Sequence, residues 1–178
     1  MSSATRYVLD ASHSRVGFSV RHMMITNVRG EFRSATGEVA FDAAAPADTR
    51  ITGTIEVASI NTREEKRDAH LRSADFFDAE QFPQLTFAST GVKASADGLD
   101  VTGDLTIHGV TRSVVLHVTE ITPEHTDPWG NRRIGALART QIKRSEFGMT
   151  WNAALEAGGI LVADDVKIEI EAQLIRQA

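Results

Sequence analysis

Apolar and polar residues alternate along most of this chain. From Val28 to Phe32 apolar or small residues alternate with arginine and glutamate, and from Val166 to Ala172 they alternate with lysine and glutamate. Successive side chains of an extended strand point to opposite faces, so a period of two gives each strand one apolar and one polar face. The pattern therefore predicts half-buried β-strands.

Turn residues separate these runs. Asp97-Gly98 and His108-Gly109 each lie between two apolar runs and predict two tight hairpins. The pattern gives roughly eight to ten strands, and it lacks the crossover helices that a parallel sheet requires. We therefore expect an all-β fold, a barrel or a sandwich, rather than an α/β fold.

One stretch, from Ser59 to Phe87, does not alternate. Thr62 followed by Glu65 resembles a capping box and predicts a short helix from Arg63 to Leu71. A helix of this length is unstable alone in water, so neighbouring apolar residues must hold it. The available residues are Ile60, Leu71, Phe76, Phe77 and Phe82.

The polar face of this helix has two interpretations. Arg67, Asp68 and His70 fit a solvated surface in which Asp68 pairs with Arg72 one turn later. Alternatively, Arg63, Arg67 and His70 lie at the mouth of a cavity and bind an anionic head group. The choice depends on whether the barrel is hollow.

Small residues on the apolar faces favour a hollow barrel. Gly53, Gly103, Ala136 and Ala138 each lie among large apolar residues of the same face. A single glycine can mark a bend, but missing bulk on several strands leaves space. An eight-stranded barrel is either just filled by side chains or holds one small ligand.

The residues expected to line this space share the apolar face of their strands. They are Phe18, Val20, Phe32, Phe41, Ile55, Phe87, Val101, Leu105, Leu116, Ala138 and Ile168.

Composition narrows the class of protein. The 178 residues fit one domain, 1–178, and 42% hydrophobic residues can form a sizeable core. A net charge of -5 argues against a nucleic-acid-binding surface, and the absence of cysteine excludes thiol chemistry. No run approaches the ~18 apolar residues of a membrane span, and the first residues lack the apolar segment of a signal peptide. We expect a cytoplasmic protein, unless a leader has been removed.

Catalytic and metal sites have weak support in the sequence. Asp10, Ser12 and His13 include the residue types of a triad, but they are nearly consecutive, and no Gly-x-Ser-x-Gly motif is present. His108 and His117 flank one predicted hairpin, but zinc needs three or four ligands. We expect no catalytic residue, no metal and no cofactor. The alternatives are a hydrolase of lipid esters or pyrophosphates and a non-catalytic interaction module.

A set of residues in a fixed order also resembles a known family. They are Tyr7, Asp10, His13-Ser14, Phe18, His22, Gly30, Phe32, Gly37, Ser59-Ile60, Thr62, Arg67-Asp68, His70-Leu71, Phe76-Phe77, Pro83, Phe87, Ser89, Gly103, Leu105-Thr106, Gly109, Thr111, Arg144 and Phe147-Gly148. This order resembles the YceI-like family of lipocalin-like, polyisoprenoid-binding proteins, from about Tyr7 to Leu174. The resemblance implies an extended antiparallel barrel around a long apolar tunnel for an isoprenoid or similar lipid, with no catalytic role. It also suggests a homodimer.

Overall fold

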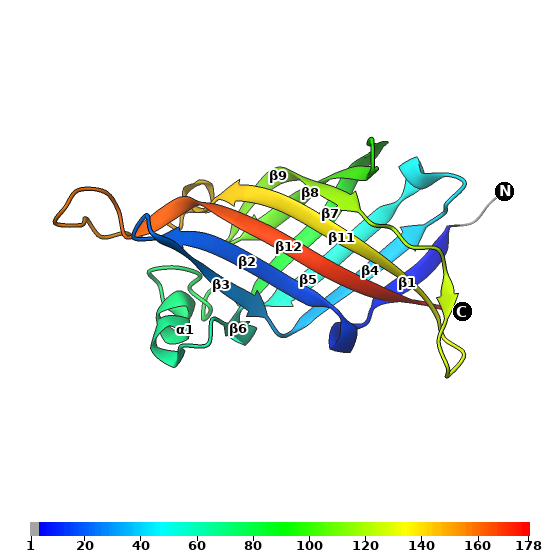
Figure 1. Ribbon diagram of the computed structural model, residues 1–178, viewed down its shortest axis with the longest axis horizontal. Coiled ribbons are helices and arrows are strands. Elements are labelled where there is room, and N and C mark those ends of the chain that lie inside the picture. Colours follow the sequence, from blue (N-terminus) through cyan, green and yellow to red (C-terminus); the bar gives the residue numbers. More distant parts are fainter. Residues whose placement is uncertain (1–3) are drawn as a thin grey trace.

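A closed antiparallel β-barrel forms most of the protein (Figure 1). The computed structural model describes residues 4–178. Its strands are β1 (Thr5–Leu9), β2 (Arg15–His22), β3 (Thr26–Phe32), β4 (Ala35–Phe41), β5 (Arg50–Glu56), β6 (Ile60–Asn61), β7 (Gln84–Ala94), β8 (Gly98–Ile107), β9 (Val110–Thr119), β10 (His125–Thr126), β11 (Arg132–Lys143) and β12 (Val162–Arg176). The one α-helix in this part of the chain is α1 (Glu65–Arg72).

Strand β12 closes the barrel. One of its edges pairs with β11, from Arg133↔Ile175 to Lys143↔Asp165. Its other edge pairs first with β2 and then, near the C-terminus, with β1. The ring β11-β9-β8-β7-β5-β4-β1-β12 therefore contains eight strands, and the prediction of an eight-stranded antiparallel barrel with one short helix is confirmed.

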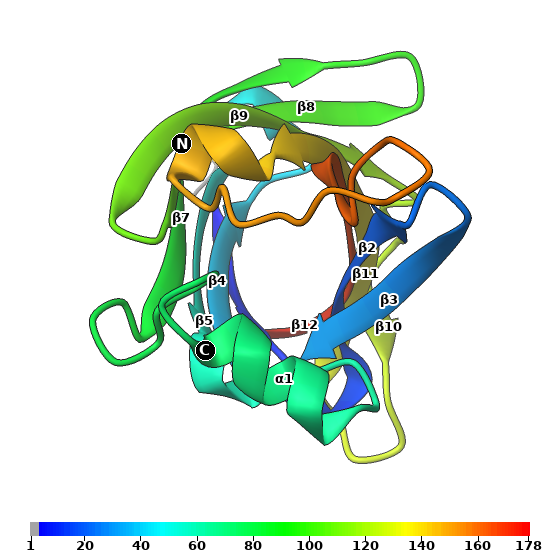
Figure 2. The ribbon, with the colours of Figure 1, turned by 90° about the vertical axis from the view of Figure 1, so that its left-hand side faces the viewer.

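Strands β2, β3 and β6 lengthen the barrel wall. β1 and β2 lie one after the other along the same edge of β12, with a 3₁₀ turn at Ala11–His13 between them. β3 pairs with β2, and β6 pairs with β3. Figure 2 looks along the barrel from the end where α1 and the loop before β12 lie at the rim. The barrel is therefore elongated, and the C-terminus lies at the opposite end (Figure 1).

Both predicted hairpins are present. β7 pairs with β8 across a turn at residues 95–97, so that Gly98 is already the first residue of β8, and β8 pairs with β9 around His108-Gly109. His108 and Gly109 have φ angles of 53° and 72°, as expected for the central residues of a type I′ turn. No helix within residues 4–178 is long and apolar enough to span a membrane. The prediction of one domain over 1–178 stays a prediction, since residues 1–3 lie outside the described part.

The predicted capping box is wrong. The helix begins at Glu65 and not at Arg63, whose φ of 66° is left-handed, and the Glu64 side chain accepts the hydrogen bond of the Arg67 N–H. The turn at Arg63 directs Thr62 to Asp68 instead, and the Thr62 N–H donates to the Asp68 carboxylate over 2.8 Å. Asp68 is buried, so it is not part of a solvated ion pair with Arg72.

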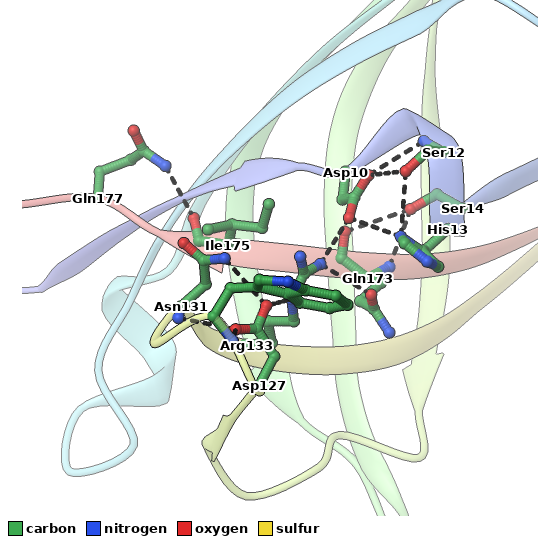
Figure 3. A network of polar contacts seen from close by, with 11 residues as sticks. Asp10, Ser12, His13, Ser14, Asp127, Asn131, Arg133, Gln173, Ile175 and Gln177 are labelled. Atoms are coloured by element: carbon green, nitrogen blue, oxygen red, sulfur yellow. Dashed lines mark hydrogen bonds and ion pairs between the residues drawn. The ribbon is translucent and has the colours of Figure 1, made fainter.

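A polar network joins segments of the barrel wall at the end opposite α1, and Figure 3 shows its residues from close by. Arg133 of β11 donates through Nε to Asp127 over 2.7 Å, and through Nη1 to Asp10 and to the Gln173 side chain. Ser14 is hydrogen-bonded to the backbone of Gln173 in both directions. The network thus links the β1–β2 connection, β12 and the loop before β11.

These contacts shift the ionisation of both acids. Hydrogen bonds from Ser12, Arg133 and His13 hold the pKa of Asp10 well below its usual range. Burial raises the pKa of Asp127, but hydrogen bonds from Arg133 and Asn131 outweigh it, and that pKa is also well below its usual range. A lowered pKa in the folded state stabilises the fold above about pH 4, the ordinary pKa, and this stabilisation is lost as the pH falls further.

We expect Arg133→Gln to lower the free energy of unfolding at pH 7, because two poorly solvated carboxylates lose their cation. The difference from the unmodified protein should shrink at pH 3, because the stabilisation from both acids is then partly lost. Urea unfolding at the two pH values measures this. Arg139→Gln is the control, since Arg139 lies on the same strand in an exposed pair with Glu169. Equal effects of both substitutions at pH 7 would contradict the account.

Candidate functional site

The barrel encloses two cavities along its axis. The first has a volume of about 180 Å³ and lies toward the C-terminal end, between residues such as Phe41, Ile51 and Leu174. The second has a volume of about 160 Å³ and lies toward α1, between residues such as Phe18, Phe77 and Val166. One water molecule needs only roughly 10–15 Å³ by this measure, so each cavity is large.

The two cavities share part of their wall. The shared residues are Val16, Ile55, Leu85, Phe87, Leu105, Leu116 and Ile170. Every side chain of the second cavity is apolar except Thr140 and Arg144. The two spaces therefore lie end to end in an apolar interior suited to a long, apolar molecule.

All of the lining residues predicted from the alternation lie on these walls. Phe41, Val101 and Ala138 line the first cavity, and the rest line the second cavity or both, namely Phe18, Val20, Phe32, Ile55, Phe87, Leu105, Leu116 and Ile168. Most of them are only half-buried although they face the interior, because the space beside them is open. Their contact with a ligand stays a prediction.

The small residues differ in what lies beside them. Gly53, Ala136 and Ala138 line the first cavity, and a Cβ at Gly53 would meet only a backbone oxygen, of Thr36, at 3.6 Å. A Cβ at Gly103 would clash with the Phe87 ring, so the expectation that Gly103 leaves open space is wrong. The Phe87 side chain packs over this glycine and fills its place.

Two segments cover the α1 end of the second cavity. Leu71, Phe76 and Phe77 come from the helical insertion, and Met149 comes from the loop before β12. The His70 ring joins these segments, because it packs edge-on against Phe76 at 5.0 Å and against Trp151 at 4.7 Å between ring centroids. The insertion thus acts as the end wall of the cavity.

Arg144 is the cation on the cavity wall, and the predicted head-group residues did not include it. It is buried, and its guanidinium donates to the backbone carbonyls of Met149, Trp151, Val162 and Ala163 at 2.8–3.1 Å. These bonds use four of its five N–H donors. Burial lowers the pKa of Arg144, and the negative charge of nearby Asp164 only partly offsets this shift. The Asp164 carboxylate accepts its hydrogen bonds from Ser145. A signal was available in the sequence, since Arg144 is among the residues that carry the family resemblance.

The predicted head-group cations lie outside both cavity walls. Arg63 is exposed, Arg67 donates to the Thr62 hydroxyl and carbonyl at 2.7 Å, and His70 is 2.8 Å from Asp75. All three belong to the insertion that covers the second cavity. They are therefore near the end of the barrel, and their contact with a head group stays a prediction.

Comparison with known proteins identifies the family. A model of the YceI-like domain matches residues 7–174. The chain belongs to the YceI-like family. Protein YceI of Escherichia coli O157:H7 is 39% identical over 148 residues, which cover 82% of this chain and 77% of that protein.

Three solved structures have the same fold as this chain. The structure of Burkholderia cenocepacia BcnA has a TM-score of 0.80 at 29% identity, over 93% of this chain and 98% of that one. A Campylobacter jejuni YCEI protein has a TM-score of 0.74 at 32% identity, over 96% and 97% of the two chains. A polyisoprenoid binding domain from Saccharophagus degradans has a TM-score of 0.67 over 98% and 99%, and its 16% identity shows a shared fold only.

The residue types of a triad do not form one in this YceI-like chain. The Asp10 carboxylate and the Ser12 hydroxyl both contact Nδ1 of His13, at 2.8 Å and 3.1 Å. In a catalytic triad the acid and the nucleophile bind different ring nitrogens. The three side chains also lie outside the lining of both cavities inside the barrel.

The histidines do not assemble a metal site within the described residues. No group of three or more histidine and carboxylate side chains there could hold a metal ion. His117 lies 2.8 Å from Asp100 across the β8–β9 pair, whereas His108 Nδ1 lies 3.1 Å from the Phe147 carbonyl. The two histidines of this hairpin therefore have separate structural partners.

A pair of glycine substitutions tests whether the interior is hollow. Gly53→Leu should change the free energy of unfolding by less than about 1 kcal/mol, because its side chain enters the first cavity. Gly103→Leu should cost about 1–3 kcal/mol, because it displaces the Phe87 ring. Urea unfolding of both variants measures the difference, and equal losses would contradict an open cavity at Gly53.

Proposed function

We propose that this protein binds a long, mostly apolar lipid, a polyisoprenoid or a similar amphiphile, inside the barrel, and stores or transports it. The observation that carries this proposal is the pair of adjoining cavities with almost wholly apolar walls. Water gains few hydrogen bonds in such a space, whereas an apolar chain gains contacts with side chains from all eight strands of the closed ring. The polyisoprenoid binding domain with the same fold supports this ligand class.

Apolar burial supplies the affinity. Each buried methylene contributes roughly 0.8 kcal/mol, against an association cost of about 4–15 kcal/mol. Several five-carbon isoprene units exceed that cost without any strong polar contact. The walls therefore select for length and apolarity more than for a particular head group.

The polar end of the ligand belongs at the α1 end of the barrel. Arg144 lies on the wall there and keeps one N–H of its guanidinium outside the four carbonyl bonds. Arg63, Arg67 and His70 lie on the covering insertion, and we retain them as the residues that contact an anionic head group. A phosphate or a hydroxyl would accept hydrogen bonds from these donors.

Two alternative functions make different demands on the site. A hydrolase needs a nucleophile with a base beside bound substrate, and neither cavity wall carries such a pair in the described residues. In such an enzyme Arg67, Asp68 and His70 would orient a water molecule. Lipid-ester or pyrophosphate turnover that disappears in His70→Ala would therefore establish a hydrolase. A purely interacting module would need no hollow interior. The homodimer and the cytoplasmic location stay predictions.

Filling the barrel should abolish lipid binding. Ala138→Phe places a ring in the first cavity, so uptake of farnesyl, geranylgeranyl and fatty-acyl ligands should fall at least tenfold while the β-sheet circular dichroism is retained. Fluorescence displacement measures the uptake. The control is Arg139→Gln, the exposed neighbour on the outer face of β11. Undiminished uptake in a folded Ala138→Phe protein would rule out a ligand in this cavity.

Neutralising the cations of the insertion should distinguish head groups. Three substitutions test this prediction, namely Arg63→Gln, Arg67→Gln and His70→Gln. Each should weaken the binding of farnesyl phosphate by about three- to tenfold more than the binding of farnesol, because only the phosphate gains a charge-assisted hydrogen bond. Arg72→Gln is the matched control, since Arg72 pairs with Glu65 on the same helix. Equal effects on the binding of both ligands would show that the head group does not contact these residues.

A further inference from the structure

Most of the large apolar side chains exposed in the described residues gather at one end of the barrel. Met23, Met24 and Ile25 are 40%, 63% and 65% exposed, and Ile160 is 44% exposed. The other two exposed large apolar residues are Val115 in β9 and Trp129 in the loop between β10 and β11. We call Met23, Met24, Ile25 and Ile160 the apolar tip.

The apolar tip is one surface made by two loops. The Met23 N–H donates to the Leu161 carbonyl over 2.7 Å, and His22 pairs with Val162. The Met24 sulfur packs over Gly159, where a Cβ would lie 2.5 Å from it. The β2–β3 turn and the loop before β12 project together beyond the barrel, at the end where α1 lies (Figure 1).

Turn chemistry does not account for these residues. The Ile25 N–H donates to the His22 carbonyl over 3.0 Å, and both central residues have positive φ, 50° at Met23 and 61° at Met24. Such a turn normally contains Asn-Gly, because these residues adopt positive φ most readily. Two large apolar side chains therefore occupy positions that are unfavourable for both backbone and solvation.

The apolar tip continues the wall of the second cavity. Val20 lies three residues before Met23 in the chain and lines that cavity, and Val162 lies directly after Leu161 and lines it too. A molecule that leaves the cavity at this end would therefore meet apolar surface on the tip.

We propose that the apolar tip inserts into the head-group region of a lipid bilayer and holds the α1 end of the barrel against the membrane. The inference rests on the proposed function, because a protein that carries a lipid must exchange its ligand with a membrane. Docking itself is a separate property and can be measured without the ligand.

Size and shape favour a bilayer over a second protein. Four partly exposed side chains offer an area on the order of a few hundred Å², below the ~800 Å² that each partner contributes to a standard protein interface. The tip is formed by projecting loops, whereas a dimer contact of this size would need a broader face. A bilayer accepts apolar side chains at its interface without a matched surface.

The surrounding charges fit a membrane surface. Residues 151–161 contain one charged side chain, Glu156. Arg21 and Arg29 lie on the same outer face of β2 and β3, are exposed, and have no carboxylate partner in the described part of the chain. Arg21 is two residues from Met23, about 7 Å along the strand, so it can reach lipid phosphates when the tip is inserted.

Vesicle co-sedimentation tests the proposal with the full chain. Vesicles of phosphatidylcholine and phosphatidylglycerol at 3:1 should pellet the protein, and Met24→Ser/Ile25→Ser should reduce the partition coefficient at least tenfold. Trp129→Ser is the control, because Trp129 is 81% exposed but lies outside the tip. No pelleting of the unmodified protein, or equal losses in both variants, would overturn membrane docking.

Two further measurements separate this inference from neighbouring ones. The Met24→Ser/Ile25→Ser protein should take up a soluble farnesyl probe as well as the unmodified chain does, since neither residue lines a cavity. Loss of uptake in both proteins would refute lipid binding but leave docking standing. Light scattering that shows a dimer converted to a monomer by these substitutions would assign the tip to a second copy and overturn the proposal.

Discussion

Closure of the sheet through β12 is the constraint on which the rest of the structure depends. One edge of this strand pairs with β11 over its length, and the other edge pairs with β2 and then β1. A closed ring of eight strands has a fixed circumference, so its interior volume does not shrink to fit the side chains. Because Gly53, Ala136 and Ala138 face this interior, it remains partly open. The cavities follow from closure and small side chains together.

The two ends of the barrel are built from different kinds of side chain, so the two ends of the site differ. At the C-terminal end the Arg133 network joins three segments with polar contacts that enclose two acids. At the other end apolar side chains of the insertion cover the second cavity, beside Arg144. The backbone carbonyls around Arg144 stabilise its charge within an otherwise apolar wall. Arg144 is therefore the charged group on the wall at the α1 end, where we propose that the polar end of the ligand lies.

Alternation predicted the strands and the inward faces, because a strand's two faces are set by parity alone. It could not predict that Phe87 fills the place beside Gly103, since that contact depends on the register between β7 and β8, which is irregular between Ser89 and Gly91. It also missed Arg144, which lies in a 3₁₀ turn outside any alternating run. The capping box predicted at Thr62 is wrong because Thr62 bonds to Asp68, while Glu64 caps the first turn of the helix. Local patterns thus identified the walls, whereas contacts between distant segments determined the details of the site.

Native mass spectrometry of the gently purified protein tests the central claim most directly. If the barrel holds a lipid, the spectrum contains the protein together with an adduct that is released as an apolar molecule on collisional activation. An isoprenoid or fatty-acyl adduct, present on purification or formed after incubation with such lipids, is the predicted result. The bare protein mass under both conditions would contradict the account.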